Sequence, residues 1–112
     1  MPIPFFAPAL VGLDAVSADE TKSAEIPLNN AVQIGGTVKW STGCSAGQVI
    51  FEIAPVAAYA GAWEAVFTGD FINNGVESFT YPGPFSGFGR WRINTAVVGG
   101  TVSSDTQMLV GA

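Results

Sequence analysis

The stretch RWRIN (residues 90–94) alternates strictly between polar and apolar side chains. Successive side chains on a β-strand point to opposite faces, so this pattern indicates a strand with one buried and one exposed face. Trp91 and Ile93 are expected to face the core, and Arg90 and Arg92 to face away from it. Alternation of this kind is typical of half-buried antiparallel strands.

The same period of two recurs elsewhere in the chain, in runs at 37–40, 48–53, 63–67, 75–81 and 101–110. Breaks rich in glycine, asparagine and proline separate the runs, at 35–36, 43–47, 73–75, 82–84 and 99–100. Asn-Gly and Gly-Gly pairs supply the positive φ that tight hairpin turns require. The sequence therefore predicts an all-β fold, either an antiparallel β-sandwich or a small jelly-roll-like barrel.

The first ten residues, MPIPFFAPAL, carry no charge. Their three prolines remove amide donors and disfavour a helix, which predicts an extended N-terminal arm. The stretch lacks the basic start of a secretory signal and is too short and too rich in proline to span a membrane. We expect an extended apolar arm over residues 1–16, a polar linker over 17–25 and a β-sandwich domain over 26–112.

The apolar side chains of the arm need cover from water. The arm either folds back on its own domain or lies across a neighbouring subunit, and we expect the second, with partner-binding residues Ile3, Phe5, Phe6, Leu10 and Leu13. Charged residues make up only 12% of the chain and hydrophobic residues 48%. Because about 25% charge is usual, we expect part of the surface to be covered by other chains in a homo-oligomer.

Charge and residue types also bear on the classes of function. The net charge is −5 with four cations, which disfavours a nucleic-acid partner. The chain has no histidine, which removes the Ser-His-Asp and Cys-His arrangements and the commonest zinc ligand. Cys44 is the only cysteine and has no basic neighbour in sequence, so it is interpreted as a structural or incidental thiol. We expect no enzyme activity, catalytic residue, cofactor or membrane partner.

Two groups of acidic and amide residues are candidates for a catalytic or metal site. Glu52, Glu64, Asp70 and Glu77 lie on or between the expected strands, and a facing pair would suit glycoside hydrolysis. Their spacing singles out no pair, so they are interpreted as solvated face residues. The stretch 69–75 (GDFINNG) offers few calcium ligands and is better interpreted as a hairpin turn, so no metal site is predicted.

The three tryptophans give one alternative function. The alternation places Trp63 and Trp91 with the apolar faces, so both are expected in the core. Trp40 follows a lysine and precedes a polar loop. An exposed Trp40 would offer a stacking platform for sugars, and the chain would then be a carbohydrate-binding β-sandwich module.

Arg90 and Arg92 are expected on the same strand face. Two interpretations of the pair remain open. They pair with cross-strand acids such as Glu64 or Glu77 on an exposed strand face, or they make an ion-pair contact to an acidic neighbouring subunit.

A wider pattern joins these elements: a Gly-x-Trp strand at 61–63, a Gly-Pro-aromatic bend at 83–85, an Arg-x-x-Ile strand at 90–93 and a closing Gly-Gly-Thr-Val at 99–102. The pattern covers about the last two-thirds of the chain. It resembles small β-sandwich proteins of tailed bacteriophage particles, although the apolar arm has no counterpart in the family pattern.

The resemblance implies a structural virion protein. It implies a capsid decoration, or cement, subunit that binds and stabilises the head shell, with a tail or neck accessory protein as the alternative. The expected partners are further copies of the chain, as a trimer, and the major capsid protein or another virion protein. Such a protein would be made in the host cytoplasm and located in the virion.

Overall fold

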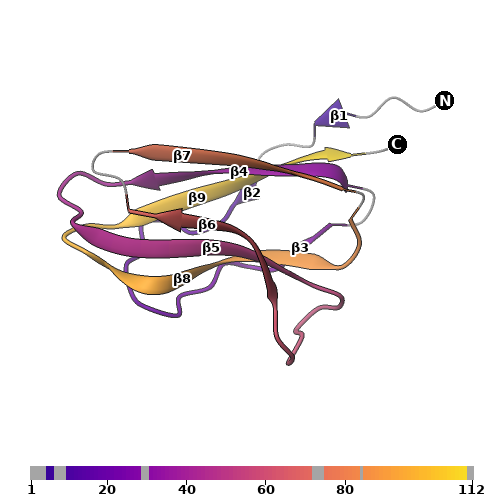
Figure 1. The fold of residues 1–112 in the computed structure, drawn as a ribbon, viewed down its shortest axis with the longest axis horizontal. Coiled ribbons are helices and arrows are strands. Elements are labelled where there is room, and N and C mark those ends of the chain that lie inside the picture. Colours follow the sequence, from indigo (N-terminus) through magenta and orange to yellow (C-terminus); the bar gives the residue numbers. More distant parts are fainter. Residues whose placement is uncertain (1–4, 7–9, 29–30, 72–74, 84, 111–112) are drawn as a thin grey trace.

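The computed structural model describes residues 5–6, 10–28, 31–71, 75–83 and 85–110. Two layers of β-strands pack face to face, and the described residues contain no helix (Figure 1). The strands are β1 Phe5–Phe6, β2 Leu10–Val11, β3 Ile26–Pro27, β4 Ala31–Trp40, β5 Ala46–Ala54, β6 Glu64–Asp70, β7 Val76–Pro82, β8 Phe88–Val98 and β9 Val102–Val110. The predicted all-β sandwich is confirmed.

Both sheets are antiparallel. Sheet A has the strand order β1-β9-β4-β7, with β2 also paired to β9, and sheet B has the order β3-β8-β5-β6. The central strand of sheet A is β4, where Thr37 lies opposite Asp105 on β9 and Ser78 on β7. Within the described part of the chain, β6 pairs only with β5 and β7 only with β4, so both are edge strands.

Trp91 on β8 lies at the centre of the core. It is fully buried and packs against three phenylalanine rings, those of Phe51, Phe67 and Phe79, with centroid separations of 5.2, 6.1 and 5.8 Å. Its indole nitrogen donates to Thr106 Oγ1 on β9 at 2.9 Å. Ile93 is also fully buried, so the alternation of residues 90–94 predicted the core face of β8 correctly.

Gly35 and Gly36 lie inside β4, so the break between strands that their sequence predicts is not present there. Neither glycine has the positive φ that a tight turn requires. A Cβ on Gly36 would lie 2.8 Å from ring atoms of both Phe79 and Trp91, so core crowding, not a turn, accounts for Gly36. Gly35 faces the other way and leaves space on the outer face of sheet A.

The described residues of the segment expected to be an arm, 5–6 and 10–16, lie along their own domain. β1 and β2 both pair with β9 of the same chain. Leu13 is 2% exposed and belongs to the core, and its amide donates to Ser104 Oγ at 2.8 Å. The expectation that Leu13 binds a partner is therefore wrong, because its side chain fills the interior of this sandwich. Leu10 is exposed, and Ile3 lies outside the described residues.

Residues 17–25, expected as a linker, follow the edge of β8. The amide of Glu20 donates to the carbonyl of Ile93, and the amide of Ile93 donates to the carbonyl of Thr21, each at 2.9 Å. The chain then continues into β3, which pairs with the start of β8. Residues 10–27 thus run from the edge of sheet A to the edge of sheet B and cover one side of the sandwich.

Candidate functional site

The outer face of sheet B carries an ion-pair network centred on Glu52. Glu52 lies on β5 and is 3% exposed. Its Oε1 accepts hydrogen bonds from Arg90 Nε at 2.9 Å and from Arg92 Nε at 3.1 Å. Glu52 and Arg90 are direct cross-strand partners in the β5–β8 register. Glu20 adds a second carboxylate, 3.2 Å from Arg92 Nη1.

Trp63 covers one end of this network. The guanidinium carbon of Arg90 lies 3.9 Å from the ring centroid of Trp63, which is a close cation–π contact. The Trp63 indole donates to the Tyr59 carbonyl at 3.0 Å, which ties the ring to the loop before β6. Side chains of the network therefore shield Glu52 from solvent on the outer face of the sheet.

A β-bulge explains why Trp63 lies outside the core, contrary to the sequence prediction. On β6, Ala65 and Phe67 pair with consecutive residues of β5, so Val66 is the extra residue. An extra residue reverses the in–out alternation along the strand. Phe67 keeps its core position, but Ala65 and the preceding Trp63 fall on the outer side.

The network continues across sheet B through neutral side chains. Arg92 Nη1 donates to Asn94 Oδ1 at 3.1 Å, and Asn94 Nδ2 donates to Gln48 Oε1 at 2.5 Å. Gln48 Nε2 in turn donates to Asp70 Oδ1 at 2.7 Å. The polar groups of this face thus satisfy one another over three strands.

Arg90 and Arg92 share one strand face, as predicted, but their acidic partners differ from the expected ones. The expected cross-strand acids were Glu64 and Glu77. Instead, both arginines contact Glu52, and Arg92 also contacts Glu20. Both arginines make these ion pairs within their own chain. The ion pairs themselves join two cations, Arg90 and Arg92, to two anions, Glu52 and Glu20.

The carboxylates around Arg92 stabilise its positively charged form. Burial lowers the pKa of Arg92, but hydrogen bonds and charges from Glu52 and then Glu20 outweigh it, so the net pKa shift is upward. The guanidinium consequently remains a cation and a donor.

Trp40 does not form an exposed stacking platform. It is 3% exposed and packs edge-on against Phe71 with a centroid separation of 5.8 Å. The interpretation of Trp40 as a sugar-binding residue is therefore wrong, because its alternation in β4 continues from Val38 and turns the ring into the core. Its indole nitrogen is buried and has no hydrogen-bond partner within the described ranges.

Glu77 also points between the sheets, since it shares a strand face with Phe79. Its Oε1 is buried and lacks a hydrogen-bond partner in the part of the chain that the structure describes. Burial raises the pKa of Glu77, and the negative charge of Asp70 raises it further. The folded chain therefore holds the Glu77 proton more tightly than an exposed glutamate does.

The remaining chemical candidates give no cluster. Asn73 and Asn74, which with Asp70 are the candidate calcium ligands of the sequence, lie outside the described residues. Elsewhere, no group of three or more acidic, cysteine or histidine side chains is placed to hold a metal, as far as the described ranges go. Cys44 is buried, and its thiol donates to the Thr101 carbonyl at 3.5 Å. No helix in these ranges is long and apolar enough to cross a membrane.

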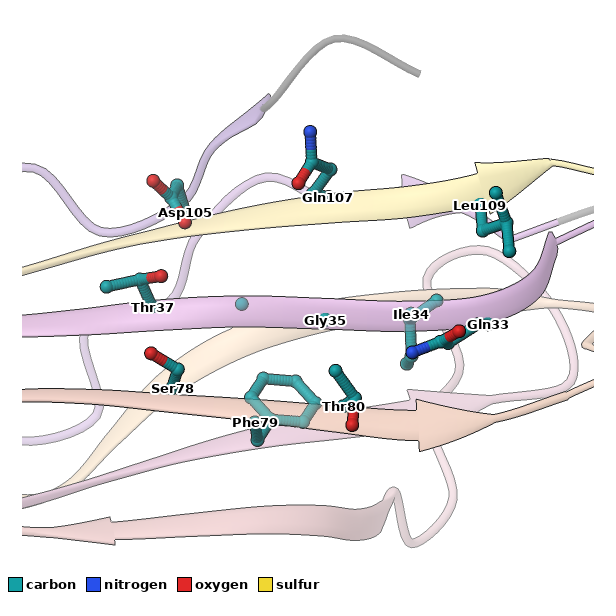
Figure 2. Close-up of a pocket in the computed structure, with 11 residues that line it drawn as sticks. Gln33, Ile34, Gly35, Thr37, Ser78, Phe79, Thr80, Asp105, Gln107 and Leu109 are labelled. Atoms are coloured by element: carbon teal, nitrogen blue, oxygen red, sulfur yellow. The ribbon is translucent and has the colours of Figure 1, made fainter. Parts of the chain in front are cut away.

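A hollow of about 350 Å³ lies on the outer face of sheet A, above Gly35. Figure 2 shows Gly35 between Gln107 of β9 and Thr80 of β7, which are its cross-strand neighbours. Gln33 and Thr37 stand to either side along β4. In the described ranges, these four side chains make no hydrogen bond to another side chain, unlike the polar groups of sheet B.

Comparison with known proteins identifies the fold. No family model and no curated protein matches the sequence. The crystal structure of the SPBc2 prophage-derived protein YomS matches with a TM-score of 0.66 and 13% identity, over 96% of each chain. A structure from the disulfide-linked pili of Bacillus endospore appendages matches with a TM-score of 0.53 and 15% identity, over 98% of this chain and 92% of that one. At these identities the likeness shows a shared fold.

The sequence did not reveal the central residue of either candidate surface, which is Glu52 on the outer face of sheet B and Gly35 on the outer face of sheet A. Glu52 was interpreted as a solvated residue, although it is the only charge in β5 and two arginines lie two residues apart on a neighbouring strand. That spacing was a usable signal for a shared carboxylate. Gly35 gave no such signal, because a glycine pair in sequence is also typical of a turn.

Proposed function

We propose that the chain is a structural subunit of a bacteriophage particle, and specifically a capsid decoration protein that binds the head shell. One observation carries the proposal: the two sides of the sandwich differ. Residues 10–27 cover the side formed by β9 and β8, whereas β6 and β7 each have one partner strand among the described residues. An open strand edge offers free backbone donors and acceptors to another chain.

The open side is long enough for a specific contact. β6 and β7 have seven residues each, so each edge is about 23 Å long. Val76 at the start of β7 is 59% exposed, and Tyr81 near its end is also exposed. A strand from another subunit placed here would gain backbone hydrogen bonds and cover these apolar side chains.

The first residues of the chain are the proposed contribution of each subunit to its neighbour. β1 is held in its own domain by two residue pairs, Phe5 with Val110 and Phe6 with Leu109. Releasing such a short strand breaks few bonds. At about 25 cal/mol per Å² of apolar surface, burying two phenylalanine side chains on a neighbour contributes a few kcal/mol before the cost of ordering.

The fold comparisons support an assembly role. A prophage-derived protein and a pilus protein of endospore appendages share this sandwich. The turn-and-core pattern of residues 61–102, which resembles small phage β-sandwich proteins, supports the same class. We propose a non-enzymatic role in the virion, as a homotrimer seated on the major capsid protein, with the tail or neck as the alternative location.

Light scattering tests the assembly. We expect the full chain to have the mass of an oligomer, and a chain lacking residues 1–9 to have a lower mass. The cut is placed before residue 10 because Leu13 fills the core, so a longer deletion would damage the fold. The double variant Phe5→Ser with Phe6→Ser should behave like the truncated chain.

The matched control is Ala7→Ser with Ala9→Ser, which changes the same segment without removing a large apolar side chain. It should keep the oligomer. A monomeric full chain would contradict self-assembly, and an oligomer that survives truncation would contradict the role of the arm. Gold-labelled antibody against the chain, applied to purified particles from the source culture, separates a head location from a tail or neck location.

A further inference from the structure

The spacing of the strands and of the side chains along them sets the width and length of the hollow above Gly35. Side chains on one strand face recur about every 6.7 Å, so Gln33 and Thr37 stand about 13 Å apart along β4. Thr80 and Gln107 belong to strands two spacings apart, which is about 10 Å. The missing side chain of Gly35 leaves backbone as the floor of the hollow, between Gln107 and Thr80 (Figure 2).

The lining of the hollow combines hydroxyl and amide groups with apolar surface, and it carries one charge. Hydroxyl groups of threonine and serine and the amide groups of Gln33 and Gln107 each donate and accept hydrogen bonds. Asp105 adds a carboxylate, which accepts strongly from hydroxyl groups. Because the lining includes no lysine or arginine, an anionic ligand would meet only repulsion from Asp105. Ile34 is fully buried and Phe79 stacks on Phe67 between the sheets, so Leu109 is the one large apolar side chain left at the rim of the hollow, which is too few for a lipid.

The two outer faces of the sandwich use the same chemical groups in opposite ways. On sheet B, Gln48 bonds to Asn94 and Asp70, so its amide is occupied. On sheet A, Gln33 and Gln107 stand at the rim of a hollow and keep their amide groups available to a ligand.

We propose that this hollow binds a neutral oligosaccharide, with Gly35 as the floor and the side chains of Gln33, Thr37, Thr80 and Gln107 as hydrogen-bonding walls. A neutral glycan matches the lining because its hydroxyl groups both donate and accept and it carries no charge. The proposal is independent of the assembly role, since the strand edges proposed for assembly belong to β6 and to the outer side of β7, whereas the hollow opens on the sheet face.

The test is calorimetric titration of the purified full chain with a panel of neutral oligosaccharides built from glucose, galactose, mannose and N-acetylglucosamine, with heparin as the anionic comparison. We expect saturable binding to at least one neutral glycan and none to heparin. Gly35→Thr fills the hollow and should lower the affinity about tenfold or more. Circular dichroism confirms the fold of each variant.

A second variant covers the case in which Gly35→Thr fails to fold. Thr80→Val with Gln107→Ala removes two walls, and both residues are exposed, so the fold should persist while affinity falls. The control Lys39→Gln is exposed on the same sheet face outside the hollow and should bind as the unaltered chain does. Absence of binding across the neutral panel, preference for heparin, or undiminished binding by the double variant would each overturn the proposal.

Discussion

The indole nitrogen of Trp91 donates a hydrogen bond to Thr106 Oγ1 at 2.9 Å, and this bond crosses the core from sheet B to sheet A. Both residues are fully buried. A buried donor without a partner costs more than a hydrogen bond gains, so Thr106 is needed once Trp91 occupies the centre. The pair therefore fixes how the two sheets face each other.

Replacing this acceptor should destabilise the sandwich. Thr106→Val keeps the shape of the side chain but leaves the Trp91 N–H buried and unpaired, so we expect a loss of about 1–3 kcal/mol in the free energy of unfolding. Urea denaturation followed by tryptophan fluorescence measures it. Thr68→Val, at an exposed position on β6, is the control and should change stability by less than about 0.5 kcal/mol. Equal effects of the two variants would show that the bond contributes nothing.

Glu52 should be the critical member of the ion-pair network. Glu52→Gln preserves its size but leaves the guanidinium of Arg90 without a counter-charge in a largely buried setting, and we expect a loss of about 2–4 kcal/mol. Thermal unfolding and denaturant titration measure the change. Glu64→Gln, the same substitution at an exposed site, should be near neutral. A stable Glu52→Gln variant would mean that the network adds little to the fold.

The two adjacent glycines of β4 should respond differently to alanine. Gly36→Ala places a Cβ 2.7 Å from the Asp105 carbonyl oxygen and against the core rings, so we expect a loss of about 1–3 kcal/mol. Gly35→Ala has its nearest contact at 3.0 Å, to the Phe79 carbonyl oxygen, and faces the open hollow. It should stay within about 1 kcal/mol of the unaltered chain. The melting temperatures of the two variants measure this difference. If Gly35→Ala were the less stable variant, the placement of Gly36 on the core face and Gly35 on the outer face would be wrong.

Stability should fall as pH rises because of Glu77. The pKa of Glu77 is raised in the folded chain, first by burial and then by Asp70, so the folded state holds the proton more tightly than the unfolded state. Its contribution to stability is complete below the ordinary pKa of 4.5 and is lost as pH rises through the raised value. Glu77→Gln should match the unaltered chain near about pH 4 and exceed it near about pH 8.

Denaturation curves for both proteins at several pH values measure this difference. Glu64→Gln serves again as the control, because this glutamate is exposed on the neighbouring edge strand. A stability gain for Glu77→Gln that is the same at every pH would rule out ionisation as its cause.

The strand alternation was enough to predict the sandwich and the burial of Trp91 and Ile93. It failed at Trp63, because the bulge at Val66 depends on the β5–β6 register, which local periodicity does not contain. It also failed at Gly36, since a glycine required by a ring on another strand has the same sequence pattern as a glycine in a turn. Both failures arise from contacts between distant segments.

The candidate surfaces were less predictable for the same reason. Arg90 and Arg92 were found from sequence, but their shared partner Glu52 follows from the pairing of β5 with β8. The hollow needs three adjacent strands with a glycine at the central position, so no single segment reveals it. Leu13 belongs to the apolar N-terminal stretch, so the sequence predicts an arm residue. Only the path of the chain along β9 places its side chain in the core.

The pairing of Phe5 with Val110 brings the two extremes of the described chain to one pole of the sandwich (Figure 1). Adjacent ends permit circular permutation, because a short linker joins them without crossing the domain. New ends opened in the turn between β8 and β9 would then emerge at a different place. The same geometry suits display, since a peptide fused after β9 would leave from this pole and keep both outer sheet faces clear.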